Sequence, residues 1–207
     1  MKLYFSPGSV ALASHIALTE AGASFEAICI DFGESEQRSA EYLAINPKGR
    51  VPALVTDEGI LTETPAILRF IAACFPGAGL FPQGAFAQGR ADAFMAYLAT
   101  TVHVAHAHGG RGHRWADQQT SFDDMKAKVS ETMRECFELI EQELIEGPWV
   151  LGEQYTVCDP YLLTLSGWLK GDGVDRRDFP KVAEQADRMR EREAVRSAWK
   201  AHFGEAM

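Results

Sequence analysis

Residues that could hold and activate a small ligand occur in three short segments near the start of the chain. The first, residues 6–10, reads Ser-Pro-Gly-Ser-Val and lies between a predicted strand and a predicted helix. Ligands of open α/β sheets collect at the carboxyl ends of strands, and helix N-termini attract anions. The Ser9 hydroxyl is therefore placed to stabilise a negative charge, although Ser9 could instead serve only as a helix cap.

The second segment contains Glu63, Thr64 and Pro65. A threonine followed by a proline is typical of an N-cap and first helical position, where unpaired backbone amides bind a carboxylate. Glu63 directly before them suits an ammonium group. A carboxylate and an ammonium on one carbon describe the α-centre of an amino acid. The alternative is a plain cap with a charge that favours the helix dipole.

The third segment contains Val51 and Pro52, at the point where a strand is predicted to begin. A proline there cannot donate a hydrogen bond to a sheet. A cis bond before Pro52 would turn the backbone of Val51 outward, free to pair with an extended ligand. The alternative is a trans proline at an ordinary strand start.

Histidines are concentrated further along, at His103, His106, His108 and His113. On a helix, His103 and His106 share a face. A metal site would need a third ligand and supporting partners, and no cysteine or HExxH pattern accompanies these histidines. We therefore expect no metal.

Two architectures must position these residues, because six of the nine prolines fall within residues 1–82. Residue patterns predict strands at 2–5, 25–30, 51–56 and 60–62, and helices at 9–21, 38–45 and 65–75. This order predicts an α/β domain over residues 1–77 with a right-handed crossover. A linker is predicted at 78–84, and an all-helical domain at 85–207, where glycine and proline are absent from 113–146.

Composition excludes several classes of protein. The chain has 207 residues and a net charge of -9, which argues against a nucleic-acid partner. No apolar run is long enough to span a membrane, and no signal-peptide core follows the start, so we expect a cytoplasmic protein. The four cysteines stand singly, which indicates neither a disulfide framework nor a zinc site.

In their order along the chain, the three segments resemble the thioredoxin-like half of a cytosolic glutathione S-transferase. Thr156 and Asp159 add the pattern of a capping box, which in that family starts a buried helix of the C-terminal domain. The resemblance covers nearly the whole chain. It implies a thioredoxin-like α/β N-terminal domain with a mixed four-stranded sheet, an all-α C-terminal helical bundle domain, and a homodimer.

Within the family, the chain most resembles the bacterial beta class, with one departure. That class carries a cysteine where this chain has Val10, and a serine where it has Ala11. A mixed disulfide between this turn and glutathione is therefore not expected. The turn instead resembles that of serine-type members, whose hydroxyl hydrogen-bonds the glutathione sulfur, a role we expect of Ser9.

The resemblance also assigns residues to ligands. Its glutathione-binding residues are Lys48 and Arg50 at the glycyl carboxylate, Val51 beside cis Pro52 at the cysteinyl part, and Glu63 with Thr64 at the γ-glutamyl end. His103 matches an active-site histidine, and Val104 replaces the lysine that accompanies it. We expect His103 to be catalytic with Ser9 by assisting the sulfur or an electrophile; the alternative is a histidine that only fills helix packing. We expect Tyr97 and Arg111 to line the electrophile pocket with His103.

The implied activity is that of a glutathione transferase, in which glutathione is the co-substrate and its thiol attacks a small apolar electrophile. A glutathione-dependent isomerase or dehalogenase is one alternative. A non-catalytic protein that binds glutathione or another ligand is the second. No metal, nucleic acid or membrane is expected as a cofactor or partner.

Overall fold

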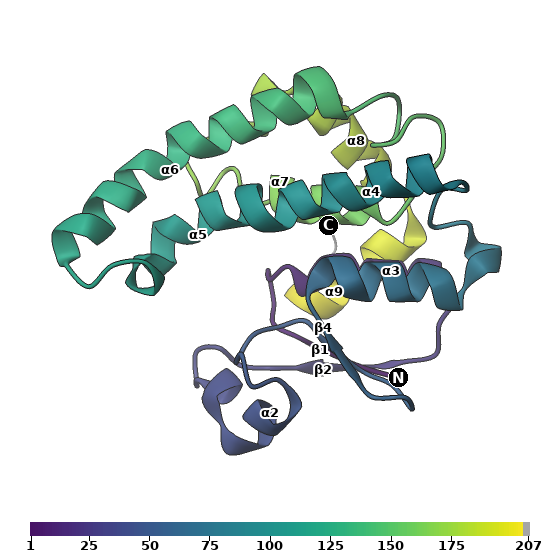
Figure 1. The fold of residues 1–207 in the computed structure, drawn as a ribbon, viewed down its shortest axis with the longest axis horizontal. Coiled ribbons are helices and arrows are strands. Elements are labelled where there is room, and N and C mark those ends of the chain that lie inside the picture. The colour runs from purple at the N-terminus through teal and green to yellow at the C-terminus, as the bar shows by residue number, and fades with distance from the viewer. Residues whose placement is uncertain (205–207) are drawn as a thin grey trace.

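A computed structural model describes residues 1–204 as an α/β lobe followed by a helical lobe (Figure 1). The α/β lobe contains β1 (Lys2–Phe5), α1 (Ala11–Glu20), β2 (Glu26–Cys29), α2 (Ala40–Ile45), β3 (Ala53–Val55), β4 (Ile60–Thr62) and α3 (Thr64–Cys74). The strand order is β2-β1-β3-β4, with β1 parallel to β2 and antiparallel to β3, and with β3 antiparallel to β4. The predicted mixed four-stranded sheet is confirmed.

The sheet is covered by helices because its apolar side chains must leave water. Leu3 and Leu54 are opposite each other on β1 and β3, and both are fully buried in a core with Ile67 and Ile71 of α3. α2 lies on the side of the sheet away from α3 (Figure 1). This arrangement leaves the carboxyl end of β1, and the turn that follows it, facing the helical lobe.

The observed element boundaries differ from the predicted ones where prolines intervene. β3 begins after Pro52, which has no N–H to give to the sheet, and the Val51–Pro52 bond is cis. α3 begins one residue earlier than predicted, and its cap is Glu63 rather than Thr64, because the Glu63 carbonyl accepts the first helical bond from the Ile67 N–H at 3.0 Å.

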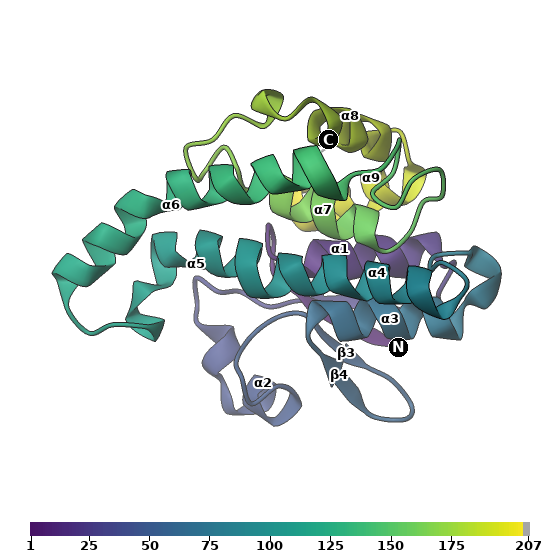
Figure 2. The ribbon, with the colours of Figure 1, turned by 45° about the horizontal axis from the view of Figure 1, so that its top comes forward.

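The helical lobe is built on two long antiparallel helical paths. One runs through α4 (Ala85–Tyr97), a π-helical turn (Leu98–Val102) and α5 (His103–Arg111), and the other through α6 (Gln119–Leu139) and a second π-helical turn (Ile140–Leu144). α5 and α6 lie side by side (Figures 1 and 2). The predicted amphipathic spacing is visible in α6, where Val129, Met133 and Phe137 are buried.

Residues 113–118 are not α-helical, although they contain no glycine or proline. The chain turns there through a 3-10 helix (Gly112–Arg114), and α6 begins only at Gln119. Gly112 permits this turn because a Cβ at that position would lie 2.9 Å from the Phe122 ring. The tight approach places Arg111 and Arg114 together at the end of α5.

The buried helix α7 (Cys158–Ser166) fixes the rest of the lobe. The Thr156 N–H donates to the Asp159 carboxylate at 2.8 Å, and the Cys158 N–H donates to Thr156 Oγ1 at 3.3 Å. The same carboxylate accepts from the Val150 N–H at 2.9 Å. α8 (Pro180–Arg190) and α9 (Glu193–Phe203) follow, and α9 packs against α1. No helix within residues 1–204 combines the length and hydropathy that a membrane crossing requires.

Candidate active site

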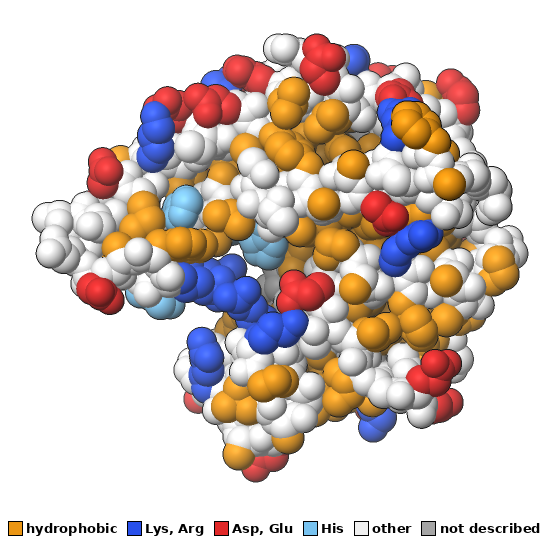
Figure 3. All heavy atoms as spheres, viewed as in Figure 1, with side chains coloured by type: hydrophobic (Ala, Val, Ile, Leu, Met, Phe, Trp, Pro, Cys, Tyr) orange, Lys and Arg blue, Asp and Glu red, His pale blue; other side chains and the backbone are white. Residues whose placement is uncertain are grey.

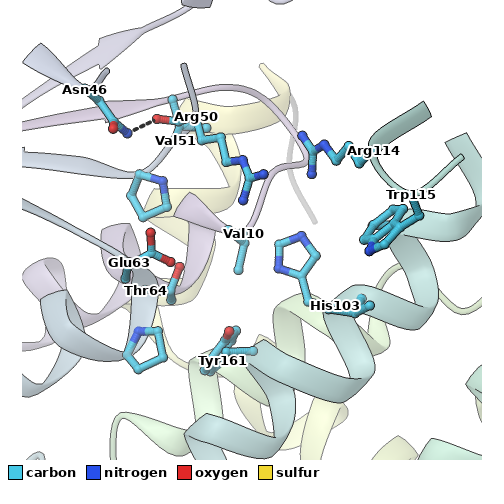
Figure 4. A pocket seen from close by; sticks show the side chains of 15 residues that line it. Val10, Asn46, Arg50, Val51, Glu63, Thr64, His103, Arg114, Trp115 and Tyr161 are labelled. Atoms are coloured by element: carbon cyan, nitrogen blue, oxygen red, sulfur yellow. Dashed lines mark hydrogen bonds between the residues drawn. The ribbon is translucent and has the colours of Figure 1, made fainter. Parts of the chain in front are cut away.

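A cleft between the two lobes holds most of the residues singled out in the sequence. It consists of two adjoining cavities of about 300 and 330 Å³. We call them the Glu63 cavity and the Arg111 cavity, after one residue that lines each alone. Val10, Arg50, Val51, His103 and Arg114 line both. Figure 3 shows the hollow between the lobes with Lys and Arg side chains gathered at it, and Figure 4 shows the Glu63 cavity.

The start of α3 forms one wall of the Glu63 cavity. Glu63 has a φ of 73°, a backbone conformation that costs a residue other than glycine about 1–3 kcal/mol and is most often kept at functional sites. Its carboxylate contacts Lys48 Nζ, which also donates to Thr62 Oγ1 at 2.7 Å. Thr64 follows at the helix N-terminus, so an anion and a cation can be held side by side here.

Val51 presents its backbone to the same cavity. Neither its N–H nor its C=O has a backbone partner among residues 1–204. The preceding carbonyl, that of Arg50, accepts from the Tyr42 hydroxyl at 2.7 Å and from Asn46 Nδ2 at 2.6 Å. These bonds fix the loop, so an extended ligand can pair with Val51 as it would with a sheet edge.

The turn after β1 reaches both cavities through Val10, and Ser9 lines the Arg111 cavity. Ser9 Oγ donates to the Ser6 carbonyl at 2.6 Å and accepts from the Ser6 and Ala11 N–H groups, each at 3.4 Å. The hydroxyl therefore already braces the turn. The N–H of Val10, the N-cap of α1, donates to no described backbone carbonyl. A sulfur at this turn could accept from the Val10 N–H, and from the Ser9 hydroxyl only when that hydroxyl turns from the Ser6 carbonyl.

Two histidines of α5 face the turn across the cleft. Burial, and then the charge of Arg111, lowers the pKa of His103 to about 4, so this ring is neutral at pH 7. His106 Nδ1 donates to the Asp172 carboxylate at 2.8 Å, since a carboxylate can only accept, and Nε2 has no hydrogen-bond partner within residues 1–204. The His106 ring stacks on Trp168, whose Nε1 donates to the Gly8 carbonyl at 3.0 Å. This contact joins the helical lobe to the turn.

The structure brings together all but a few of the predicted site residues. Those that line the cleft are Ser9, Arg50, Val51, Pro52, Glu63, Thr64, His103 and Arg111. Lys48 reaches it through its contact with Glu63. Tyr97 does not line either cavity; its hydroxyl donates to the Cys136 carbonyl at 3.4 Å, and its ring packs against the core. Within residues 1–204 no three metal-ligating side chains cluster.

Sequence reasoning missed Arg38, Arg114 and Tyr161, which line the cleft, and Asp172, which contacts His106. Tyr161 is 1% exposed and lines the Glu63 cavity, and burial raises the pKa of its hydroxyl well above its usual range. It stays protonated and can donate. A signal for Tyr161 was present, because it lies two residues beyond Asp159 on the capped helix. Arg38, Arg114 and Asp172 belong to no motif.

A thioredoxin-like sheet with a strained helix start, a cis proline and a helical lobe across the cleft defines the glutathione transferase class of fold and site. The family model for the glutathione S-transferase N-terminal domain matches residues 1–73. A glutathione S-transferase from Xanthomonas campestris is 33% identical, with 84% of this chain and 85% of the relative covered. The chain belongs to the glutathione S-transferase family of enzymes.

Solved structures agree with this assignment. A glutathione transferase homologue from Sulfitobacter, with bound glutathione, is 46% identical with a TM-score of 0.95, and the match covers 97% of each chain. A beta-class glutathione S-transferase from Sphingomonas chungbukensis is 32% identical with a TM-score of 0.86, over 98% of this chain and 99% of the other. The predicted two-part fold and the family are thus confirmed.

Proposed function

We propose that this chain binds glutathione across the cleft and activates its thiol at the turn of Ser9 and Val10 for attack on a small electrophile. The observation that carries the proposal is the convergence of Glu63, Thr64 and the free backbone of Val51 on a cavity that Val10 also lines. The Sulfitobacter relative holds glutathione on the same fold.

Each part of glutathione has a matching group in this arrangement. The γ-glutamyl ammonium meets Glu63, and the neighbouring carboxylate meets the N-terminus of α3 at Thr64. The cysteinyl part pairs with Val51, and the glycyl carboxylate lies near Arg50, while Lys48 is engaged by Glu63. The sulfur then lies at Val10. The homodimer predicted from the family remains a prediction.

Activation of the thiol requires a modest stabilisation of its anion. A thiol has a pKa of about 8.5, and lowering this pKa by about two units makes the thiol mostly ionised at pH 7. This shift corresponds to ~2.7 kcal/mol of stabilisation of the thiolate relative to the thiol. A hydrogen bond to a charged acceptor contributes about 1.5–3 kcal/mol, and a helix N-terminus about 0.3–1 kcal/mol. The Ser9 hydroxyl must turn from the Ser6 carbonyl to the sulfur to supply this bond.

The test compares Ser9→Ala with the wild type. Retention on immobilised glutathione establishes binding, and conjugation of chlorodinitrobenzene establishes turnover. We expect Ser9→Ala to raise the pKa of the bound thiol by about one to two units and to lower kcat/KM about 10- to 100-fold. Ser14→Ala is the matched control, because its buried hydroxyl on α1 makes no described hydrogen bond and lies outside the cleft.

Unchanged turnover and an unchanged thiol pKa in Ser9→Ala would remove Ser9 from the mechanism. Binding of glutathione without turnover of any electrophile in a panel would instead favour the non-catalytic alternative.

A further inference from the structure

The Arg111 cavity carries more positive charge than glutathione can use. Arg38, Arg50, Arg111 and Arg114 line it, and no aspartate or glutamate within residues 1–204 does. Arg38 and Arg50 come from the α/β lobe, Arg111 from the end of α5, and Arg114 from the 3-10 helix that follows α5. Figure 4 shows the Arg50 and Arg114 side chains reaching toward each other across the cleft. The charge is local, because the chain as a whole has a net charge of -9.

These four arginines differ from most others in the chain, because they have no partner among residues 1–204. Seven of the thirteen arginines form ion pairs within residues 1–204: Arg69, Arg90, Arg134, Arg177, Arg188, Arg190 and Arg192. None of the four in the cavity forms an ion pair or a side-chain hydrogen bond within the described part of the chain. Such a concentration of like charge is unfavourable unless an anion offsets it.

The guanidinium groups also lie near enough to repel one another. The pKa of Arg111 is lowered by burial and then by the charge of Arg50. The pKa of Arg114 is lowered by burial, and then by Arg50, Arg111 and Arg38. His103 adds no charge to this group at pH 7, because its pKa is lowered to about 4.

Glutathione offsets only part of this charge. Its γ-glutamyl carboxylate belongs to the start of α3 in the Glu63 cavity, and its glycyl carboxylate needs one guanidinium from the α/β lobe, such as Arg50. Arg111 and Arg114 stand on the opposite wall, on the lobe that also carries His103 and His106. That wall lines the same cavity as Ser9 and Val10, where the proposed function places the sulfur.

We infer that the electrophile carries a carboxylate, which Arg111 and Arg114 bind beside the glutathione sulfur. The inference rests on the proposed glutathione transferase function, and it replaces the apolar electrophile expected from the sequence. A planar guanidinium presents two parallel N–H donors to a carboxylate, and a cavity of about 330 Å³ suits a small molecule. The reaction needs no further reactant: the thiolate bonds to the electrophilic carbon, and the leaving group departs with its electron pair.

A pair of stable conjugates tests the inference without relying on turnover. S-(para-carboxybenzyl)glutathione and S-benzylglutathione differ only in the carboxylate, and calorimetry measures the Kd of each. We expect the carboxylate to tighten binding to the wild type about tenfold. This advantage should disappear in Arg111→Gln with Arg114→Gln, and return in part in Arg111→Lys. Arg177→Gln is the control, because that side chain is 87% exposed and outside the cleft.

Kinetics give the second measurement. The probes are ortho-nitrochlorobenzenes with a carboxylate or a carboxamide in the para position, from which chloride leaves. We expect the double variant to lower kcat/KM about tenfold for the carboxylate and to leave the carboxamide within about twofold. Each probe is compared with its own wild-type value, so their different reactivities cancel.

Three outcomes would overturn the inference. The carboxylate could give no advantage in the wild type, or its advantage could persist in the double variant. Alternatively, the variant could raise the pKa of the bound thiol and slow both probes equally, which would assign the arginines to the thiolate. In all three, S-benzylglutathione still binds and the proposed function stands. If neither conjugate nor glutathione binds the wild type, the proposed function itself fails.

Discussion

At the residue scale, Glu63 is the side chain whose role in glutathione binding is most directly testable. We expect Glu63→Gln to weaken binding about tenfold, because a charged hydrogen bond to the γ-glutamyl ammonium becomes a neutral one in a partly exposed site. Calorimetric titration with glutathione measures this. Glu58→Gln, on the exposed β3–β4 turn, is the control. An unchanged Kd in Glu63→Gln would place the ammonium elsewhere.

Residues within local motifs could be predicted, whereas those brought in by tertiary structure could not. Ser9, Val51 and Glu63 each lie in a turn whose chemistry can be recognised from its neighbours in sequence. Arg114 reaches the cleft only because of how α5 ends, and Asp172 reaches His106 only because the segment after α7 folds back. Tyr97 was expected in the cleft but lies outside it, because the register of α4 turns its hydroxyl toward the Cys136 carbonyl of α6.

At the element scale, α7 depends on its capping pair more than on its own sequence. Replacing Asp159 with alanine leaves the N–H groups of Thr156 and Val150 buried without an acceptor. We expect Asp159→Ala to lower the free energy of unfolding by about 3 kcal/mol or more, and Thr156→Ala by about 1 kcal/mol. Urea unfolding measures both. Equal losses from the two substitutions would contradict the idea that the carboxylate joins α7 to the loop at Val150.

Element positions were predicted well where the glycine and proline positions agree with the spacing of apolar residues. β1 and β4 have the predicted bounds, and α1 and α3 lie within two residues of them. The π-helical turn between α4 and α5 was not predicted, because its extra residue per turn depends on packing against α6 and α7. The same holds for residues 113–118, where the approach of Phe122 to Gly112 decides the turn. The π-helical turn and the non-helical segment 113–118 flank α5, and both therefore affect how His103 and Arg111 enter the cleft.

At the scale of the whole molecule, the order of an α/β part and a helical part followed from the distribution of prolines, but their mutual placement did not. The two parts are joined by the hydrogen bond from Trp168 to the Gly8 carbonyl and by α9, which returns from the end of the chain to pack on α1. Such contacts join residues far apart in sequence, and a single sequence does not specify them.

The return of α9 also creates a buried pair of histidines, which predicts acid sensitivity of the fold. His202 is 3% exposed, and its ring lies 5.3 Å from that of His15 on α1. Neither ring nitrogen of His202 has a described partner. Burial, and then His15, lowers its pKa to about 3, against about 6.5 when unfolded. Below about pH 6.5 the unfolded chain binds the extra proton, so the stability present at pH 7 is lost as the pH falls.

We expect His202 to account for about 2 kcal/mol of lost unfolding free energy between pH 7 and pH 5. His202→Phe keeps an aromatic ring against Phe5 and removes the titrating group, so the variant should be as stable as the wild type at pH 7 and about 2 kcal/mol more stable at pH 5. Urea midpoints at the two pH values measure this. The exposed His113→Gln serves as control, because it should follow the wild type at both. If His202→Phe loses stability with falling pH as steeply as the wild type does, then His202 is already protonated in the folded chain and its burial against α1 has no role in acid sensitivity.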